Sequence, residues 1–225
     1  VGGSLNRTYT YDRLGNIEAL TRSGVLWDYT YETNNDLAHK PYRLKGVSGL
    51  NFSASVTTGY DSRGNLIQYT QGATTYSLTF DVEGRLTQVT KGNQTAEFQY
   101  DADGQRVLAV YKTNGSETTR VYTPFPDYEE EVPTTGSSTQ RVTFSANGQV
   151  AVARKKVGSG AAALYSLHTD QLGNVAAVAN SAGVYVTDSY AMYEPFGAFL
   201  LRPTATNPSV SDRGFTGQRS NNLSP

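Results

Sequence analysis

The heptapeptide YDSRGNL, residues 60–66, decides the fold of this chain. An aspartate at the entrance of a turn accepts hydrogen bonds from backbone amides further along, and Asp61 stands at that position. Glycine adopts a positive φ without steric cost, which suits Gly64 as the left-handed residue of the turn. The aromatic Tyr60 and the aliphatic Leu66 are typical of the strands on either side. The heptapeptide therefore predicts a β-hairpin corner.

The same phrase recurs along the chain, so the corner is a repeat. Its aromatic residue falls at positions 11, 31, 60, 80 and 100, which gives intervals of 20, 29, 20 and 20 residues. In the second copy Asn35 replaces the glycine, and asparagine tolerates the left-handed conformation best among the other residues. Looser copies follow around Gly148, Gly173 and Gly197. The predicted turn residues are Asp12, Gly15, Asn35, Asp61, Gly64, Asp81, Gly84, Asp101, Gly104, Gly148, Asp170, Gly173 and Gly197, and the predicted strand-ending aromatic residues are Tyr11, Tyr31, Tyr60, Phe80, Tyr100 and Tyr193.

A period of about 20 residues leaves room for two strands of about 6 to 8 residues and two turns. The chain has 16 Tyr and 22 Gly against one Met and one Trp, and it lacks long stretches with the helical period. We therefore predict an all-β chain whose hairpins form one spiral antiparallel sheet with open strand edges at both ends. A propeller fits less well, because its repeat spans about 40 residues. The longer interval is expected to hold an inserted loop over residues 41–51.

Charge and residue usage argue against several classes of function. The net charge of −1 does not favour a nucleic-acid partner. The absence of cysteine removes disulfides, thiolate metal sites and cysteine nucleophiles. No apolar run approaches the roughly 18 residues of a membrane helix, so we predict no membrane insertion. The sequence starts and stops within its own pattern, and we expect it to be a piece of a longer polypeptide.

The repeated aspartates could supply the paired carboxylates of a glycoside hydrolase. All of them occupy the same turn position, however, which favours turn capping. His168 and Asp170 form the best metal-like pair, but zinc takes three or four ligands and the other histidine, His39, is distant in the sequence. We expect a buried structural hydrogen bond for His168. The sequence therefore predicts no catalytic residue, no metal site and no cofactor.

Two charged runs and the many tyrosines have surface interpretations. The acidic run at residues 127–131 could bind a cation or a partner, although a solvated turn is favoured. The basic run at residues 154–156 is expected to end a strand and to protect it from edge pairing. Exposed tyrosines could stack on sugars, but packing and cross-strand pairing account for them more simply.

Three phrases in the second half carry a resemblance to a known family. They are HTDQLGN at residues 168–174, PFG at 195–197 and FTGQ at 215–218. With the YD phrase and its 20-residue period, they resemble the RHS-repeat or YD-repeat superfamily, which includes bacterial polymorphic toxins, the C subunits of insecticidal toxin complexes, and teneurins. The resemblance implies YD-repeat hairpins over residues 1–120 and an RHS repeat-associated core region over 121–225, continuous with the same sheet.

The resemblance also implies a function. Members of the family form a hollow shell, which in bacteria encloses a C-terminal toxin, so the implied partners are the remainder of the shell and an enclosed passenger polypeptide. The family's self-cleavage aspartates lie in segments that would follow Pro225, so no enzymatic residue is assigned and the chain is not expected to be an enzyme. The expected location is secreted or cell surface. The alternative is an extracellular adhesion or carbohydrate-binding protein that contacts a cell-surface protein or glycan.

Overall fold

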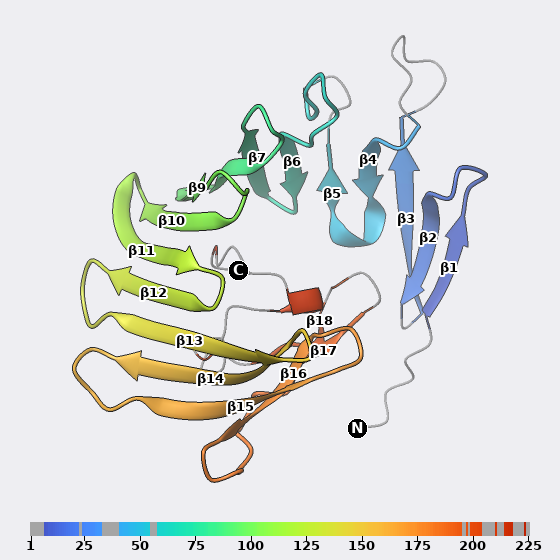
Figure 1. The fold of residues 1–225 in the computed structure, drawn as a ribbon. Coiled ribbons are helices and arrows are strands. Elements are labelled where there is room, and N and C mark those ends of the chain that lie inside the picture. The colour runs from blue at the N-terminus through green and yellow to red at the C-terminus, as the bar shows by residue number, and fades with distance from the viewer. Residues whose placement is uncertain are drawn as a thin grey trace. The chain divides into compact units, whose positions relative to one another are not determined.

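The structure is a computed structural model of the chain, and it describes residues 7–22, 24–32, 41–54, 58–194, 197, 199–203, 210, 214–217 and 223. In these residues the regular structure consists of eighteen β-strands and two short 3-10 helices. Sixteen strands form one antiparallel sheet whose strand order is the chain order (Figure 1). The all-β prediction is confirmed. Over the same ranges, no helix is long and apolar enough to span a bilayer.

Short turns join most neighbouring strands of the sheet, and longer connections join β3 to β4 and β5 to β6. The strands are β1 (Arg7–Tyr11), β2 (Ile17–Arg22), β3 (Val25–Tyr31), β4 (Leu44–Val47), β5 (Phe52–Ser53), β6 (Gln68–Gln71), β7 (Thr74–Phe80), β8 (Leu86–Lys91), β9 (Gln94–Tyr100), β10 (Arg106–Thr113), β11 (Ser116–Phe125), β12 (Tyr128–Pro133), β13 (Thr139–Ala146), β14 (Gln149–Val157), β15 (Ala163–Thr169) and β16 (Val175–Asn180). A second, two-stranded sheet pairs β17 (Met192–Tyr193) with β18 (Phe199–Leu201). The 3-10 helices are η1 (Ser48–Leu50) and η2 (Phe215–Gly217).

The chain divides into two compact units, residues 1–95 and 96–225. The first contains β1 to β8, the second contains β10 to β18, and β9 crosses the boundary. The domain boundary predicted from the motifs, between residues 120 and 121, falls inside β11. The two divisions rest on different properties, compactness and sequence motifs, so the motif-based division stays a prediction.

In the first unit, the sheet has one apolar face because successive side chains of a strand alternate. In β7, Tyr76, Leu78 and Phe80 are half-buried, whereas the intervening residues are exposed. Tyr76 stacks on Tyr69 of β6, with ring centroids 4.6 Å apart and an interplanar angle of 6°. Cross-strand aromatic pairs of this kind stabilise neighbouring strands.

The prediction of an inserted loop at residues 41–51 was wrong. This segment contains β4, which pairs with β3 on one side and with β5 on the other, followed by η1. Gly49 of η1 lies against the indole of Trp27, and a Cβ added at Gly49 would stand 2.0 Å from Trp27 Cδ1. The extra residues of the long interval therefore extend the sheet, and a glycine lets the connection pack against Trp27.

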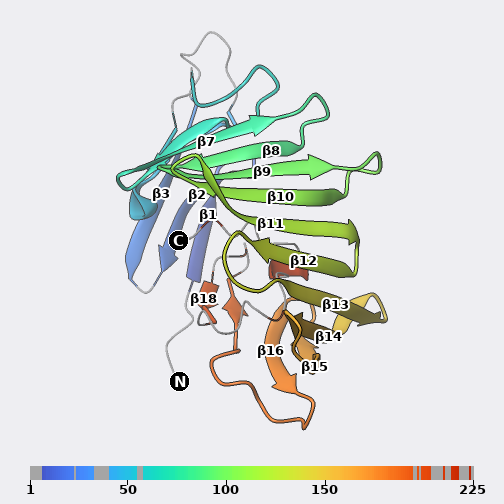
Figure 2. The same ribbon diagram turned by 90° about the vertical axis from the view of Figure 1, so that its left-hand side faces the viewer.

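In the second unit, β10 to β13 run side by side as antiparallel neighbours (Figure 2). The hydrophobic core of this unit lies on β14, β15 and β16. Val210, from the C-terminal segment, belongs to the same cluster and lies against these strands. The core residues are Val150, Ala153, Leu167, Val175, Val178 and Val210, with Tyr165 and Val186 packed against them.

Candidate functional site

The corner at residues 60–66 shows how the repeat unit holds its shape. Asp61 Oδ1 accepts hydrogen bonds from the backbone amides of Arg63 and Asn65, at 2.9 and 2.8 Å. Asp61 Oδ2 accepts a third bond, from Asn65 Nδ2 at 2.9 Å. Gly64 has a φ of 93° and donates its amide to the carbonyl of Asp61. The aspartate carboxylate therefore accepts hydrogen bonds from across the corner, and the glycine adopts the positive φ that other residues avoid.

Four other corners repeat these bonds. In each, the Oδ1 atom of the aspartate accepts from the amides two and four residues further on, at 2.8 to 3.0 Å. The glycine of each has a φ between 79° and 86°. These corners contain Asp12 and Gly15, Asp81 and Gly84, Asp101 and Gly104, and Asp170 and Gly173. Asn35, predicted to serve the second copy, lies outside the described residues.

The copy at Gly148 is a different turn. Asn147 and Gly148 both have positive φ values, 52° and 78°, and they connect β13 directly to β14. Two successive positive values define the two-residue type I′ hairpin, for which Asn-Gly is the preferred sequence. Gly148 therefore lies at a turn as predicted, but in one that uses no capping aspartate.

Two of the strand-ending tyrosines bond to the backbone of the preceding repeat. The hydroxyl of Tyr31 donates to the carbonyl of Ile17 at 3.0 Å, and that of Tyr60 donates to the carbonyl of Leu44 at 2.7 Å. Burial raises the pKa of both phenols. Phe80 and Tyr100 are half-buried at the corresponding positions, whereas Tyr11 is exposed.

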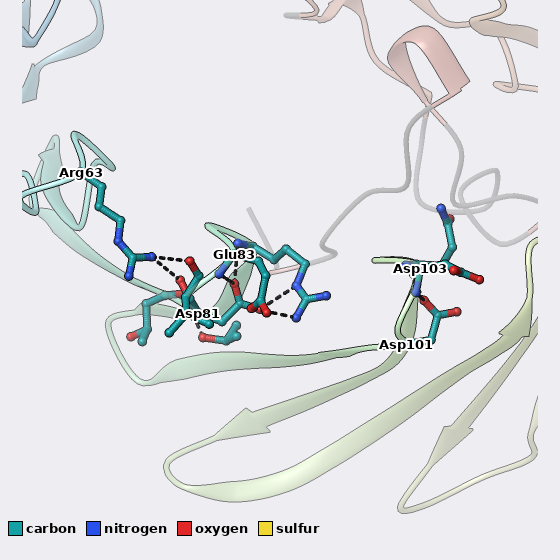
Figure 3. Close-up of polar contacts among 10 residues, drawn as sticks. Arg63, Asp81, Glu83, Asp101 and Asp103 are labelled. Carbon is teal, nitrogen blue, oxygen red and sulfur yellow. Dashed lines mark hydrogen bonds and ion pairs between the residues drawn. The ribbon is translucent and has the colours of Figure 1, made fainter.

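Two arginine side chains bond to the backbone of corners in the first unit. Arg43 Nη2 donates to the carbonyl of Asp61 at 3.2 Å. Arg63 Nη1 donates to the carbonyls of Asp81 and Val82, at 3.1 and 2.7 Å, so that it reaches the next corner (Figure 3). These bonds carry charge on the donor side and are stronger than neutral ones. Arg63 thus connects its own corner to the next one.

The electrostatics of the corners agree with a structural role. The side-chain amide of Asn65, followed by the backbone amides of the turn, holds the pKa of Asp61 below its ordinary value, and Asn16 does the same for Asp12. A carboxyl group with a lowered pKa is ionised near neutral pH and holds no proton to donate. Among the described residues, no group of three or more His, Asp or Glu side chains could hold a metal ion.

The acidic run at residues 127–131 is not the predicted solvated turn. It lies largely in β12, where Glu129 stands opposite Arg141 of β13 and their side chains pair at 2.6 Å. Glu129 is 5% exposed and Arg141 is 8% exposed. Arg141 also pairs with Glu131 at 2.8 Å. The register between β12 and β13 places Glu129 opposite Arg141 and so forms a buried ion pair. The order of residues alone does not reveal this register.

The basic run at residues 154–156 lies at the end of a strand as predicted, because β14 stops at Val157. That strand pairs with both β13 and β15, so the predicted role in edge protection was wrong. Lys155 stands opposite Arg141. Burial, together with the charge of Arg141, lowers the pKa of Lys155, and Glu131 partly offsets the shift.

The structure brings together three phrases that lie far apart in the sequence. Asn174, which is 2% exposed, donates from Nδ2 to Asp170 Oδ2 at 2.6 Å. Its Oδ1 accepts the backbone amide of Thr216 at 2.5 Å, over a separation of 42 residues. Thr216 has a φ of 51°, an uncommon conformation for a β-branched residue. The bond from Asn174 therefore reaches a strained turn in η2.

Aromatic packing completes this junction. Gly197, with a φ of 86°, lies against Phe215, and an added Cβ would stand 2.8 Å from Phe215 Cδ1. The ring of Tyr193 packs between Phe199 and Phe215, with centroid distances of 4.8 and 5.8 Å. Burial, and then the charge of Asp170, raises the pKa of Tyr193. Residues 195, 196 and 218 of the quoted phrases lie outside the described residues.

His168 is exposed on β15, so the predicted buried histidine was wrong. Leu167 beside it takes the buried face, and adjacent residues of a strand point to opposite faces. An open cleft of about 390 Å³ adjoins the junction. Its lining side chains are uncharged, and the lining residues are Ser145, Gly148, Gln149, Val150, Gln171, Leu172, Gly173 and Thr216.

Comparisons with known proteins agree with this geometry. Residues 2–221 match the family described as Teneurin YD-shell. Crystal structures of TcdB2-TccC3-TEV, TcdB2-TccC3-Cdc42 and TcdB2-TccC3 without its hypervariable C-terminal region share the fold, with TM-scores of 0.72, 0.67 and 0.70 and sequence identities of 22%, 20% and 22%. Each alignment covers 95% of this chain and 11% of the other. The comparison with curated proteins gives no match.

Proposed function

The chain belongs to the Teneurin YD-shell family, and we propose that this segment of a YD-repeat shell forms part of a wall that encloses a C-terminal passenger or toxin polypeptide. The proposal is structural: the segment contributes surface and closure, and the passenger carries the activity. Its partners are the remainder of the same shell and the enclosed passenger. We also propose a secreted or cell-surface location, as the resemblance implies.

One observation carries the proposal. The sixteen strands are ordered as they are in the chain, and each corner returns the backbone to a neighbouring strand. A polypeptide built this way extends one sheet continuously with every repeat that is added. Such a sheet is suited to making a wall, because inner strands have both edges paired and only the end strands need protection.

The structural relatives support the same proposal. One of them is named as lacking a hypervariable C-terminal region, and another includes Cdc42 in its name. The chain spans 11% of the length of these relatives, so enclosure requires the longer polypeptide to which such a segment belongs. In that setting the segment would contribute one stretch of the wall.

Protease protection tests this function. The sample is the full-length polypeptide that contains these residues, with a protease recognition site placed in its C-terminal region. We expect cleavage at least about tenfold slower than at the same site in the isolated C-terminal region, because the wall limits access. Mild denaturant that opens the shell should remove the protection. Equal cleavage rates in folded and isolated samples would reject enclosure, and binding of the folded protein to glycans would then favour the adhesion or carbohydrate-binding alternative.

A further inference from the structure

The outer edge of β16 is covered, although β16 is the last strand of the large sheet. Its edge groups are bonded by residues 184–191 of the segment that follows it. The amide of Ala191 donates to the carbonyl of Ala176 at 2.8 Å, and the amide of Val186 donates to the carbonyl of Val178 at 2.9 Å. The expectation of an open edge at this end was therefore wrong. Residues 181–191 are called the edge cap below.

Ser189 is the central residue of the edge cap. It is 1% exposed, and its Oγ accepts the amide of Val178 at 3.0 Å and donates to the carbonyl of Val178 at 3.2 Å. A neighbouring strand would bond to Val178 through the same two backbone groups. The Ser189 hydroxyl thus accepts the outward amide of Val178, and it shares the Val178 carbonyl with the backbone amide of Val186.

Strand β16, which the edge cap covers, has a composition that favours pairing with another strand. Residues 175–180 read VAAVAN, without charge, proline or glycine. Short uncharged segments of this kind add to other strands when their edges are exposed, and natural proteins protect such edges. The other end strand, β1, carries Arg7, and charge discourages pairing.

We propose that the edge of β16 is a self-association surface that the edge cap keeps covered. When the cap is displaced, β16 pairs antiparallel with β16 of a second copy around a two-fold axis at Val178. The amide and carbonyl of Val178, now bonded by Ser189 and Val186, then exchange hydrogen bonds with Val178 of the second copy. Ala177 pairs with Ala179, so small neutral side chains meet across the interface. Such a contact is isologous and closes as a dimer. It does not depend on passenger enclosure.

The test weakens the edge cap in the 225-residue chain. Ser189→Ala removes the hydroxyl, and Ala191→Pro removes the amide that bonds to Ala176. We expect the double variant to dimerise with a dissociation constant at least about tenfold below that of the parent, measured by analytical ultracentrifugation. Ser181→Ala, on an exposed serine of the same segment, is the matched control and should leave the constant unchanged.

A third substitution shows whether β16 itself forms the contact. Ala177→Lys, at a half-buried position of β16, places two positive charges beside the proposed axis and should return the double variant to the parent's constant. If the double variant does not fold, Ser189→Ala alone decides, because it retains every backbone donor of the cap. A folded variant whose Val178 amide exchanges faster than in the parent, but whose mass distribution equals the parent's, would overturn the proposal. Dimerisation that Ala177→Lys leaves unchanged would also overturn it.

Discussion

The aspartate of each corner combines three functions in one side chain. It ends the strand, accepts two backbone amides through Oδ1 and, at Asp12, Asp61 and Asp170, accepts an asparagine amide through Oδ2. Asparagine at the same position would offer one acceptor oxygen and carry no charge. The preference for aspartate follows from the number of donors that the corner presents.

The asparagine at the end of the corner should tune the acidity of its aspartate. Because the pKa of Asp61 is lower in the folded chain than the ordinary 3.8, ionised Asp61 favours folding above that pH. This contribution is lost as the pH falls through the lower folded pKa. We expect Asn65→Ala to raise the pKa of Asp61 toward 3.8, measured by NMR titration of its carboxyl carbon. Asp12, which keeps Asn16, is the internal control. An unchanged titration of Asp61 would contradict the assigned bond.

The glycine of a corner is required for its conformation and not for space. Nothing lies within 4 Å of a Cβ built on Gly64, whose φ is 93°. We expect Gly64→Ala to lower the free energy of unfolding by about 1–2 kcal/mol, measured by urea denaturation. Gly64→Asn should cost less, because asparagine tolerates positive φ. Equal losses for the two variants would contradict a conformational cause.

Local sequence predicts the corners well because the interactions are local. The bonds of Asp61 reach residues no more than four positions away, so the heptapeptide contains its own explanation. Gly148 shows the limit of this reasoning. Its spacing from Phe144 fits the repeat, yet without an aspartate the preceding Asn147 takes positive φ and a two-residue turn forms.

At the scale of the strand, the pairing register determines which side chains meet, and the sequence alone does not show that register. Glu129 and Arg141 are 12 residues apart and meet because β12 and β13 pair in one register. A shift by one residue would place them on opposite faces. The sequence of the acidic run is therefore compatible with a solvated turn, and only the strand pairing shows that Glu129 is buried against Arg141.

Removing one partner of the buried ion pair should lower the free energy of unfolding more than replacing both partners with apolar residues. Arg141→Met leaves Glu129 buried without its partner, and we expect a loss of about 3–5 kcal/mol in unfolding free energy by urea denaturation. The double variant Arg141→Met/Glu129→Leu should recover part of that loss. Arg120→Met, at a more exposed pair with Glu117, is the matched control and should cost no more than about 1 kcal/mol. Equal effects at both pairs would show that burial does not matter here.

At the scale of the whole chain, the family resemblance identified the sequence phrases that form the junction. It did not show which of their residues contact one another. Asn174 closes a corner, and its remaining oxygen bonds to Thr216, 42 residues away. No local pattern signals that contact, because corners with and without it share the same sequence phrase. Ser189 is missed for the same reason, since its role depends on an edge that only the folded sheet defines.

Asn174 should therefore stabilise the chain more than its counterpart Asn65. Both donate Nδ2 to the aspartate of their own corner, whereas Asn174 also holds the amide of Thr216. We expect Asn174→Ala to cost about 0.5–1.5 kcal/mol more than Asn65→Ala in urea denaturation, because the part-buried hydrogen bond to the amide of Thr216 is lost as well. Proteolysis should also cut near residues 214–217 faster in Asn174→Ala alone. Equal costs and equal cleavage would contradict a role in anchoring η2.

The strand order makes a final prediction about how stability is distributed. Because the order of strands in the sheet is the order of the chain, destabilisation should remain close to where it is introduced. In native-state hydrogen exchange, Gly64→Ala should lower the protection of amides in β6 and β7 by about 1–2 kcal/mol and change those in β14 and β15 by less than about 0.5 kcal/mol. Arg141→Met should show the reverse pattern. A uniform loss over all strands would mean that the sheet unfolds as one cooperative unit, and the chain would then behave as a closed domain and not as an array of repeats.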